Sequence, residues 1–340
     1  MPNVLTITPY KEFSNRGQKS FNFIDALSGV KNVRTINVHH SLKSKCNEDL
    51  HIPVDDSKVD VCVMHIDPHH FVKTKYPSIG VFEPKTIGNH EKSIYTQFLD
   101  VLAVYSNKQK EICKSYNDNI KVIRPSINLE GVLSRMKSIQ TTLKFYVPSV
   151  EKTSNISLVI KSYFKAFTAG DNVMLGVLSE NSQRDIQLFE SIKDECGLRP
   201  KDEYPEIVLY NNMKDIQNDC HCCIDVDSTY EINTATLLAT KFGNPIVCLN
   251  TSSIQEWLPD EISYKVSSYE DFVFGSNKQY IYDREVWQKF SLLELSNVMR
   301  GIYEDRLTFR GKQDKVVSEY HSMFHPSNSI SSMENLLCFY

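Results

Sequence analysis

Long apolar runs, secretory patterns and spaced cysteines are all missing from this 340-residue sequence. No apolar run approaches the roughly 18 residues that a membrane-spanning helix needs. The first residues, MPNVLTITPYKEF, contain no basic stretch followed by an apolar one, so we expect no signal peptide. The nine cysteines are scattered and odd in number, which favours reduced thiols over a disulfide framework. We therefore expect a cytoplasmic protein with no transmembrane segment.

Glycine is also scarce, with only 12 in the chain. The segment after the first apolar run, TPYKEFSNRG, offers the single glycine Gly17 and no G-x-G-x-x-G pattern. That pattern lets the backbone approach a dinucleotide pyrophosphate, so its absence disfavours a dehydrogenase. The composition, 41% hydrophobic and 24% charged, is that of an ordinary globular protein.

Short runs rich in β-branched residues alternate with helix-compatible stretches along the chain. Continuous apolar strands that alternate with helices are typical of parallel sheets covered on both faces. A first series of expected strands covers residues 3–8, 33–38, 59–66, 78–83, 101–106 and 120–125. A second series covers residues 143–148, 173–179, 206–211, 222–227, 245–250 and 262–266.

The two series predict an α/β fold with two Rossmann-like domains that face each other across a cleft. The boundary falls near residues 130–142, which gives an N-terminal domain of residues 1–138 and a C-terminal domain of residues 139–321. Residues 322–340 are too short for a domain, and their apolar side chains need a surface to bury. We expect this segment to cross back to the first domain.

The stretch STYEINTATLLATKFGNPIV, residues 228–247, has the pattern of a loop with one acid, a helix, a glycine stop and a buried strand. In doubly wound sheets, ligands bind at the loop that follows the carboxyl end of a strand. Glu231 is therefore a candidate ligand-binding residue. The alternative is an acid that only complements the dipole of the helix behind it.

This stretch resembles the S-x-x-E-G-F-G…E-A-M-A-x-G-x-P-V motif of the GT-B glycosyltransferases, most closely their family-4 group. Other segments resemble landmarks of that family in the same order. They are TPYKEFSNRGQKSFNFIDAL with Gly17, IGVFEPKT with Glu83, VLAVYSNKQKEICKSYNDNIKVIRPSIN, and EKTSNISLVIKSYFKAF. Together they span nearly the whole chain. The resemblance implies a retaining hexosyl- or pentosyltransferase that uses a UDP- or GDP-sugar as co-substrate and requires no metal or other cofactor.

The resemblance also implies roles for individual residues. Lys152 and the backbone at the helix start would hold the donor diphosphate, because a cation and free N–H groups stabilise a leaving phosphate. Glu231 would accept hydrogen bonds from hydroxyls of the donor sugar. The expected catalytic residues are Glu231, Lys152, Asp67 and His65, and the expected donor-binding residues are Gly17, Lys152, Glu231, Ile232, Asn233 and Thr234.

Three parts of the sequence depart from the family pattern. Leu238 stands where a second glutamate contacts the nucleotide ribose, residues 232–234 replace Gly-Phe-Gly, and Tyr146 falls where an arginine is expected. A catalytically silent relative that works as a binding module therefore stays open as an alternative to an active enzyme.

The segment VMHIDPHHF contains His65, Asp67, His69 and His70 at the end of an expected strand. Imidazole and carboxylate are common metal ligands, but this position also suits an acceptor site or an ordinary polar loop, and we expect no metal. CHCC, residues 220–223, lacks a partner pair at zinc-finger spacing and lies on an expected strand, which favours buried structural thiols.

Charge is distributed unevenly along the chain. Residues 1–140 contain 19 Lys and Arg against 14 Asp and Glu, a balance of +5, whereas the remaining residues contain 19 against 28, a balance of −9. By resemblance the first domain takes the acceptor, with Arg16, Glu83, His69 and His70 on that side. We therefore expect an anionic acceptor, either a glycan or a lipid-linked one. DNA is the alternative, for an enzyme that glycosylates a hydroxylated base.

Overall fold

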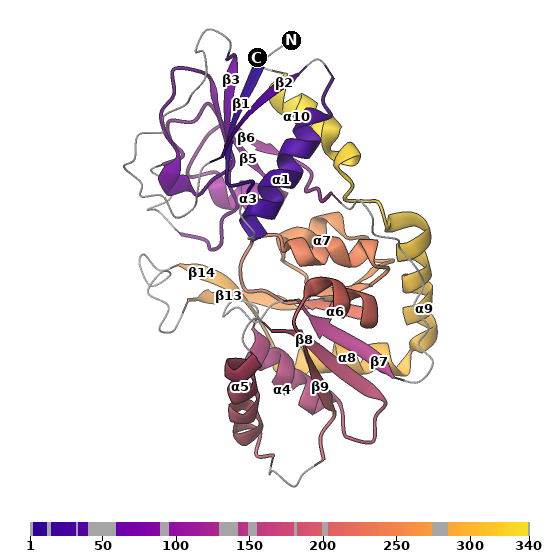
Figure 1. Ribbon diagram of the computed structural model, residues 1–340. Coiled ribbons are helices and arrows are strands. Elements are labelled where there is room, and N and C mark those ends of the chain that lie inside the picture. The colour runs from indigo at the N-terminus through magenta and orange to yellow at the C-terminus, as the bar shows by residue number, and fades with distance from the viewer. Residues whose placement is uncertain are drawn as a thin grey trace.

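The structure, a computed structural model, describes residues 3–11, 15–31, 33–39, 59–88, 95–128, 142–148, 155–179, 182–198, 203–273 and 285–338. Two parallel six-stranded sheets, one in each half of the chain, form two Rossmann-like units. Figure 1 shows the first unit, in indigo to purple, above the second, in magenta to orange. The two predicted series of strands are confirmed.

The first sheet contains β1 (Asn3–Thr8), β2 (Arg34–His39), β3 (Val61–Met64), β4 (Ser78–Val81), β5 (Val101–Val104) and β6 (Ile120–Val122). Its order is β2-β1-β3-β4-β5-β6, so the switch point of the topology lies between β1 and β3. The helical segments are α1 (Asn15–Ser28) after β1, η2 (Pro68–His70) after β3 and α3 (Asn107–Cys113) after β5.

The second sheet contains β7 (Leu143–Val147), β8 (Val173–Leu178), β9 (Glu206–Tyr210), β10 (Cys222–Asp225), β11 (Ile246–Leu249) and β12 (Ser263–Val266). Its order, β9-β8-β7-β10-β11-β12, is that of dinucleotide-binding domains, with the switch point between β7 and β10. The strands alternate with α4 (Ile156–Ala166), α5 (Ser182–Glu195), α6 (Met213–Asp219), α7 (Thr234–Lys241) and η4 (Ser253–Trp257).

Helix α7 carries the chain from the second switch point to β11, and local sequence defines both of its ends. At the start, the Asn233 side chain accepts a hydrogen bond from Ala235 N at 2.9 Å. At the end, Gly243 has a φ of 75°, and Asn244 N donates to Ala239 O at 2.9 Å. This Schellman arrangement needs a residue that tolerates left-handed backbone, and the proline that follows cannot continue a helix.

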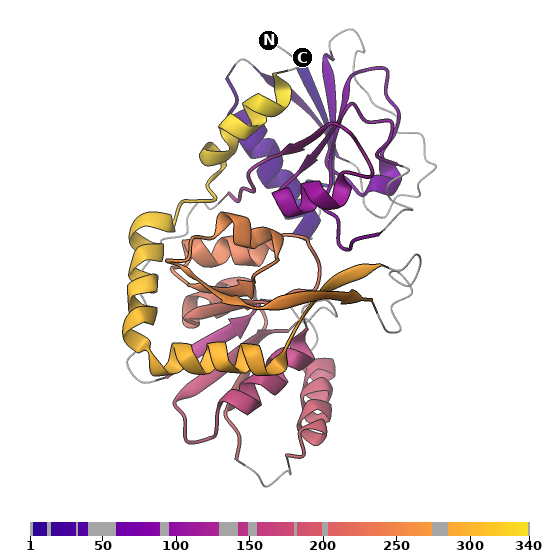
Figure 2. The same cartoon turned by 180° about the vertical axis from the view of Figure 1, so that it is seen from behind.

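The last part of the chain crosses from the second unit to the first. It contains α8 (Leu292–Glu304), α9 (Arg306–Lys315), η5 (Val316–Tyr320), η6 (Pro326–Ser329) and α10 (Ile330–Leu337). α8 packs on α4 and β12, whereas η6 and α10 lie against α1, as Figure 2 shows from behind. Ile127 N donates to Phe324 O at 2.8 Å, which fixes the crossing segment near the end of β6. The predicted crossing is confirmed.

A two-stranded antiparallel hairpin, β13 (Ser268–Phe272) and β14 (Val286–Phe290), was not expected from the sequence. Its residues are mostly polar and partly exposed, so they lack the apolar run that identifies the buried strands. Ile87 of the first unit pairs with Val286 across two backbone hydrogen bonds of 2.8 and 3.0 Å. The hairpin therefore links the two units.

Apolar packing also joins the two units. One cluster of buried apolar residues includes Phe23 and Ile79 from the first unit and Ile232 and Leu237 from the second. No helix among the described residues is long and apolar enough to cross a membrane.

Truncation of Leu336 tests the docking of α10. This side chain is 1% exposed, so Leu336→Ala should lower the free energy of unfolding by about 3 kcal/mol through lost burial and a cavity. Leu307→Ala is the matched control, because Leu307 is 83% exposed on α9. Urea unfolding should show a clear shift of midpoint for Leu336→Ala alone, and equal midpoints would contradict the packing of α10.

Candidate functional site

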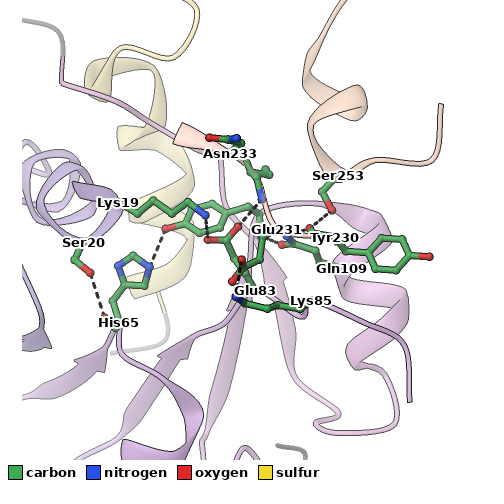
Figure 3. Close-up of polar contacts among 12 residues, drawn as sticks. Lys19, Ser20, His65, Glu83, Lys85, Gln109, Tyr230, Glu231, Asn233 and Ser253 are labelled. Atoms are coloured by element: carbon green, nitrogen blue, oxygen red, sulfur yellow. Dashed lines mark hydrogen bonds and ion pairs between the residues drawn. The ribbon is translucent and has the colours of Figure 1, made fainter. Parts of the chain in front are cut away.

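The carboxyl ends of the two sheets meet where the two units touch. The loops after β4, β5 and β6 approach the β10–α7 loop there, and ligands of doubly wound sheets bind outside such strand ends. A small pocket between them is lined by Lys19, Glu83, Tyr105, Pro125, Ser126, Ile232 and Leu237. This region is the candidate site, and Figure 3 shows its polar contacts.

Glu83 lies at the centre of the site and is buried. Lys19 Nζ of α1 donates to its Oε1 at 2.7 Å, and the backbone N–H of Ile232 donates to its Oε2 at 2.8 Å (Figure 3). The side chains of Lys19 and Glu83 are only 9% and 7% exposed. Both carboxylate oxygens therefore have protein donors, one from each unit.

Glu231 lies between β10 and α7, next to the second switch point. Lys85, which follows β4 in the first unit, places its Nζ 3.4 Å from Glu231 Oε2. The side chains of Lys85 and Glu231 are 32% and 19% exposed, so this pair is more accessible than the pair of Lys19 and Glu83. Glu231 thus faces the boundary between the units, where the sequence predicted a ligand.

The other predicted donor-binding residues of this loop occupy the start of α7. Ile232 is 1% exposed and donates its N–H to Glu83, and Asn233 uses its side chain to cap the helix. Thr234 is the first residue of α7 and is buried. The backbone at this helix start points its partial positive charge toward the boundary.

His65 directly follows β3 and belongs to the same polar layer. Its Nε2 lies 3.5 Å from the hydroxyl of Tyr105, and Ser20 Oγ donates to its backbone oxygen at 3.3 Å. Burial, together with the charge of Glu83, raises the pKa of Tyr105 well above 10, so the phenol is a proton-bearing donor at neutral pH. The structure therefore connects His65, through Tyr105, with the pocket.

Asp67, His69 and His70 form a separate turn at η2. Asp67 Oδ1 accepts from His69 N at 3.2 Å and lies 2.7 Å from His69 Nδ1, and the His69 ring packs against Tyr95. Within the part of the chain that the structure describes, no group of three or more His, Cys, Asp or Glu residues is arranged to hold a metal ion. The CHCC cysteines, Cys220, Cys222 and Cys223, are buried.

The remaining predicted site residues are Lys152, Arg16 and Gly17. Lys152 lies outside the described residues, although Asn155, three positions later, donates to Val226 O at 2.7 Å. Arg16 and Gly17 lie in the first turn of α1.

Sequence reasoning missed several residues that build the site. Within the described residues, Lys19 and Lys85 place their ammonium groups beside Glu83 and Glu231. Gln109 and Ser253 donate to Tyr230 O at 2.7 and 2.6 Å. Lys85 was detectable, because it stands two residues after Glu83 in EPKT, just after an expected strand. Nothing local identifies Gln109, whose partner is 121 residues away.

Asp225 ends β10 beneath α7 and is a buried carboxyl. Thr236 Oγ1 of α7 donates to its Oδ2. Burial nevertheless dominates and raises the pKa of Asp225 to about 6. The strand that leads to Glu231 thus ends in a group whose charged form is unfavourable in the folded protein.

No protein-family model and no curated protein matches this sequence. Solved structures do match. HepE of Anabaena, in complex with UDP, has a TM-score of 0.68 at 10% identity over 100% of both chains. Sucrose-phosphate synthase of Thermosynechococcus elongatus has a TM-score of 0.65 at 10% identity, over 100% of this chain and 99% of that chain. A glycosyltransferase of Rickettsia africae has a TM-score of 0.62 at 12% identity, over 99% and 97%.

These similarities show the fold. The chain has the GT-B fold, with two Rossmann-like units and a C-terminal helix that returns to the first, as its sequence motifs implied.

Asp225 predicts a dependence of stability on pH. Its folded pKa, about 6, lies above the ordinary 3.8, so its contribution to stability is full below pH 3.8 and is lost as the pH rises through 6. Asp225→Asn keeps an acceptor for Thr236 and removes the charge. As the pH rises from 4 to 8, the free energy of unfolding of Asp225→Asn should increase relative to the wild type by up to about 3 kcal/mol. This is the free energy that corresponds to a shift of roughly two pKa units.

Chemical unfolding at a series of pH values measures this gain. Asp314→Asn, at an exposed position of α9, changes the net charge equally and serves as the control. A constant difference between Asp225→Asn and the wild type at every pH would refute the raised pKa.

Proposed function

We propose that this protein is a glycosyltransferase that moves a sugar from a nucleotide sugar to a hydroxyl acceptor. The observation that carries the proposal is the position of Glu231. It follows the switch-point strand β10, faces the boundary between two Rossmann-like units, and is partly exposed beside Lys85. A carboxylate there can accept hydrogen bonds from two adjacent hydroxyls of a donor sugar.

The donor diphosphate is assigned to the start of α7 and to Lys152. The helix start offers partial positive charge, and a lysine neutralises the negative charge that develops as the nucleotide leaves. Asn155 supports this assignment, because it ties the beginning of α4 to Val226 and Ser228, in the loop that leads to Glu231. A UDP-sugar is the favoured donor, since HepE, with the same fold, is known in complex with UDP and with UDP-glucose.

The acceptor side is assigned to the first unit. His65 and the protonated Tyr105 lie at the carboxyl ends of β3 and β5, on the opposite side of the pocket from the β10–α7 loop. The net balance of +5 in residues 1–140 favours an acceptor that is anionic or sits on an anionic surface, such as an acidic or lipid-linked glycan. We assign retention of the anomeric configuration by analogy with the family that the motifs resemble.

Sugar nucleotides should stabilise the protein, and the Glu231 carboxylate should be needed for turnover. A donor at 100 times its dissociation constant adds about 2.7 kcal/mol, which thermal shift detects across UDP- and GDP-sugars. With that donor, Glu231→Gln should lower hydrolysis or transfer at least tenfold, about 1.4 kcal/mol. Lys152→Ala should mainly weaken binding of the diphosphate.

Glu111→Gln, which alters an exposed glutamate of α3, is the control for charge and expression. A donor that binds without any turnover would support the silent binding module. Full activity in both Glu231→Gln and Lys152→Ala would overturn the assignment of the donor site.

Acceptor binding should depend on salt. If the acceptor is duplex DNA held through several phosphates, affinity should collapse by orders of magnitude between about 50 and 200 mM salt. An acidic or lipid-linked glycan with few charges should lose affinity more gently as salt is added. Salt screens exposed charges over a Debye length of about 10 Å at 0.1 M, so each of its few ionic contacts is weakened only in part. Titrations of each acceptor class at several salt concentrations measure this. A neutral acceptor bound equally at all of them would refute the anionic assignment.

A further inference from the structure

The backbone on both sides of Glu231 is held mainly by the other unit. Tyr230 N donates to Lys85 O at 3.1 Å, and Ile232 N donates to Glu83 Oε2 at 2.8 Å. Gln109 Nε2 donates to Tyr230 O at 2.7 Å. All three partners belong to the first unit, whereas Glu231 belongs to the second (Figure 3).

These contacts lie away from solvent. Glu83 is 8% exposed, and Gln109, Tyr230 and Ile232 are at most 1% exposed. Water therefore cannot replace a lost partner without a structural change, and each unmade hydrogen bond costs the desolvation of a buried polar group, about 1–3 kcal/mol.

Gln109 is the partner whose geometry is most closely defined, because both the oxygen and the nitrogen of its side-chain amide form hydrogen bonds. Its Oε1 accepts from Tyr105 N at 2.7 Å, while its Nε2 donates to Tyr230 O. The side chain thus ties the end of β5 in the first unit to the residue before Glu231. Ser253, from the second unit itself, donates to the same carbonyl at 2.6 Å.

We infer that Gln109, together with Glu83, is a positioning residue that sets the orientation of Glu231 from the first unit. The Glu231 carboxylate is then correctly aimed only while the two units are in contact. This inference rests on the proposed role of Glu231 at the donor sugar. Both residues act through the backbone of residues 230–232.

The sharpest variant is Gln109→Glu, which has nearly the same shape. The introduced carboxyl still accepts from Tyr105 N, but when ionised it cannot donate to Tyr230 O. When protonated it regains a donor, and burial raises the pKa of such a group. We therefore expect its donor turnover to fall at least tenfold, about 1.4 kcal/mol, at pH 8 and to recover relative to the wild type as the pH falls.

Two comparisons separate positioning from a general loss of structure. In the double variant Gln109→Glu/Glu231→Gln, turnover at pH 8 should be no lower than in Glu231→Gln alone. The reason is that both changes impair the same function, that of the Glu231 carboxylate. Asn107→Ala, on the same helix, loses a 3.1 Å hydrogen bond to Glu256 of the second unit and should stay within about twofold of the wild type, as an exposed contact.

Amide hydrogen exchange tests the contact without any substrate. Residues 230–232 should exchange faster in Gln109→Glu than in the wild type at pH 8, and Asn107→Ala should match the wild type. A wild type that neither binds nor turns over any sugar nucleotide defeats the proposed function, yet faster exchange would still support the positioning contact. Unchanged exchange, a pH profile parallel to that of the wild type, or additive losses in the double variant would overturn the inference.

Discussion

Three backbone groups beside Glu231 need hydrogen-bond partners in a place that water does not reach. The first unit provides a partner for each, and Ser253 of the second unit adds another donor to one of them, the Tyr230 carbonyl. The carbonyl and N–H of Tyr230 and the N–H of Ile232 are bonded to Gln109, Lys85 and Glu83. Buried backbone groups are almost always paired, so the N–H groups of Tyr230 and Ile232 favour this path of the β10–α7 loop while the first unit is in place. The candidate site is therefore a property of the contact between the units and not of either unit alone.

Other contacts support the same arrangement from both directions. Glu256 of η4 accepts from the N–H groups of Asn107 and Lys108 at 2.7 Å each and so caps α3, the helix that carries Gln109. Trp257 Nε1 donates to Tyr105 O at 2.7 Å. The hairpin pairs with Ile87, and the shared apolar cluster continues beneath the loop. Because these contacts are distributed along the boundary, the alignment of the two sheets does not depend on one bond.

Among the ion pairs that the structure describes near the boundary, those of Glu83 and Glu231 differ in what they can do. Lys19 and Glu83 are almost completely buried, and removal of either would leave an uncompensated charge, which costs several kcal/mol. Lys85 and Glu231 are partly exposed and separated by 3.4 Å, and exposed pairs contribute little to stability. The first pair therefore serves the structure, whereas the second can exchange its partner for a ligand.

The sequence by itself determined the elements that depend on local patterns. The apolar runs identified all twelve strands of the two sheets, and Asn233 and Gly243 marked the ends of α7, because periodicity, capping and backbone freedom act over a few residues. Only the tertiary structure decided which side chains meet. Glu83 and Ile232 are 149 residues apart, and their bond exists because two sheets, each specified locally, bring their strand ends together. The polar hairpin could not be predicted from the sequence for a related reason. Its strands form by pairing with each other and with Ile87, and not by burying an apolar run.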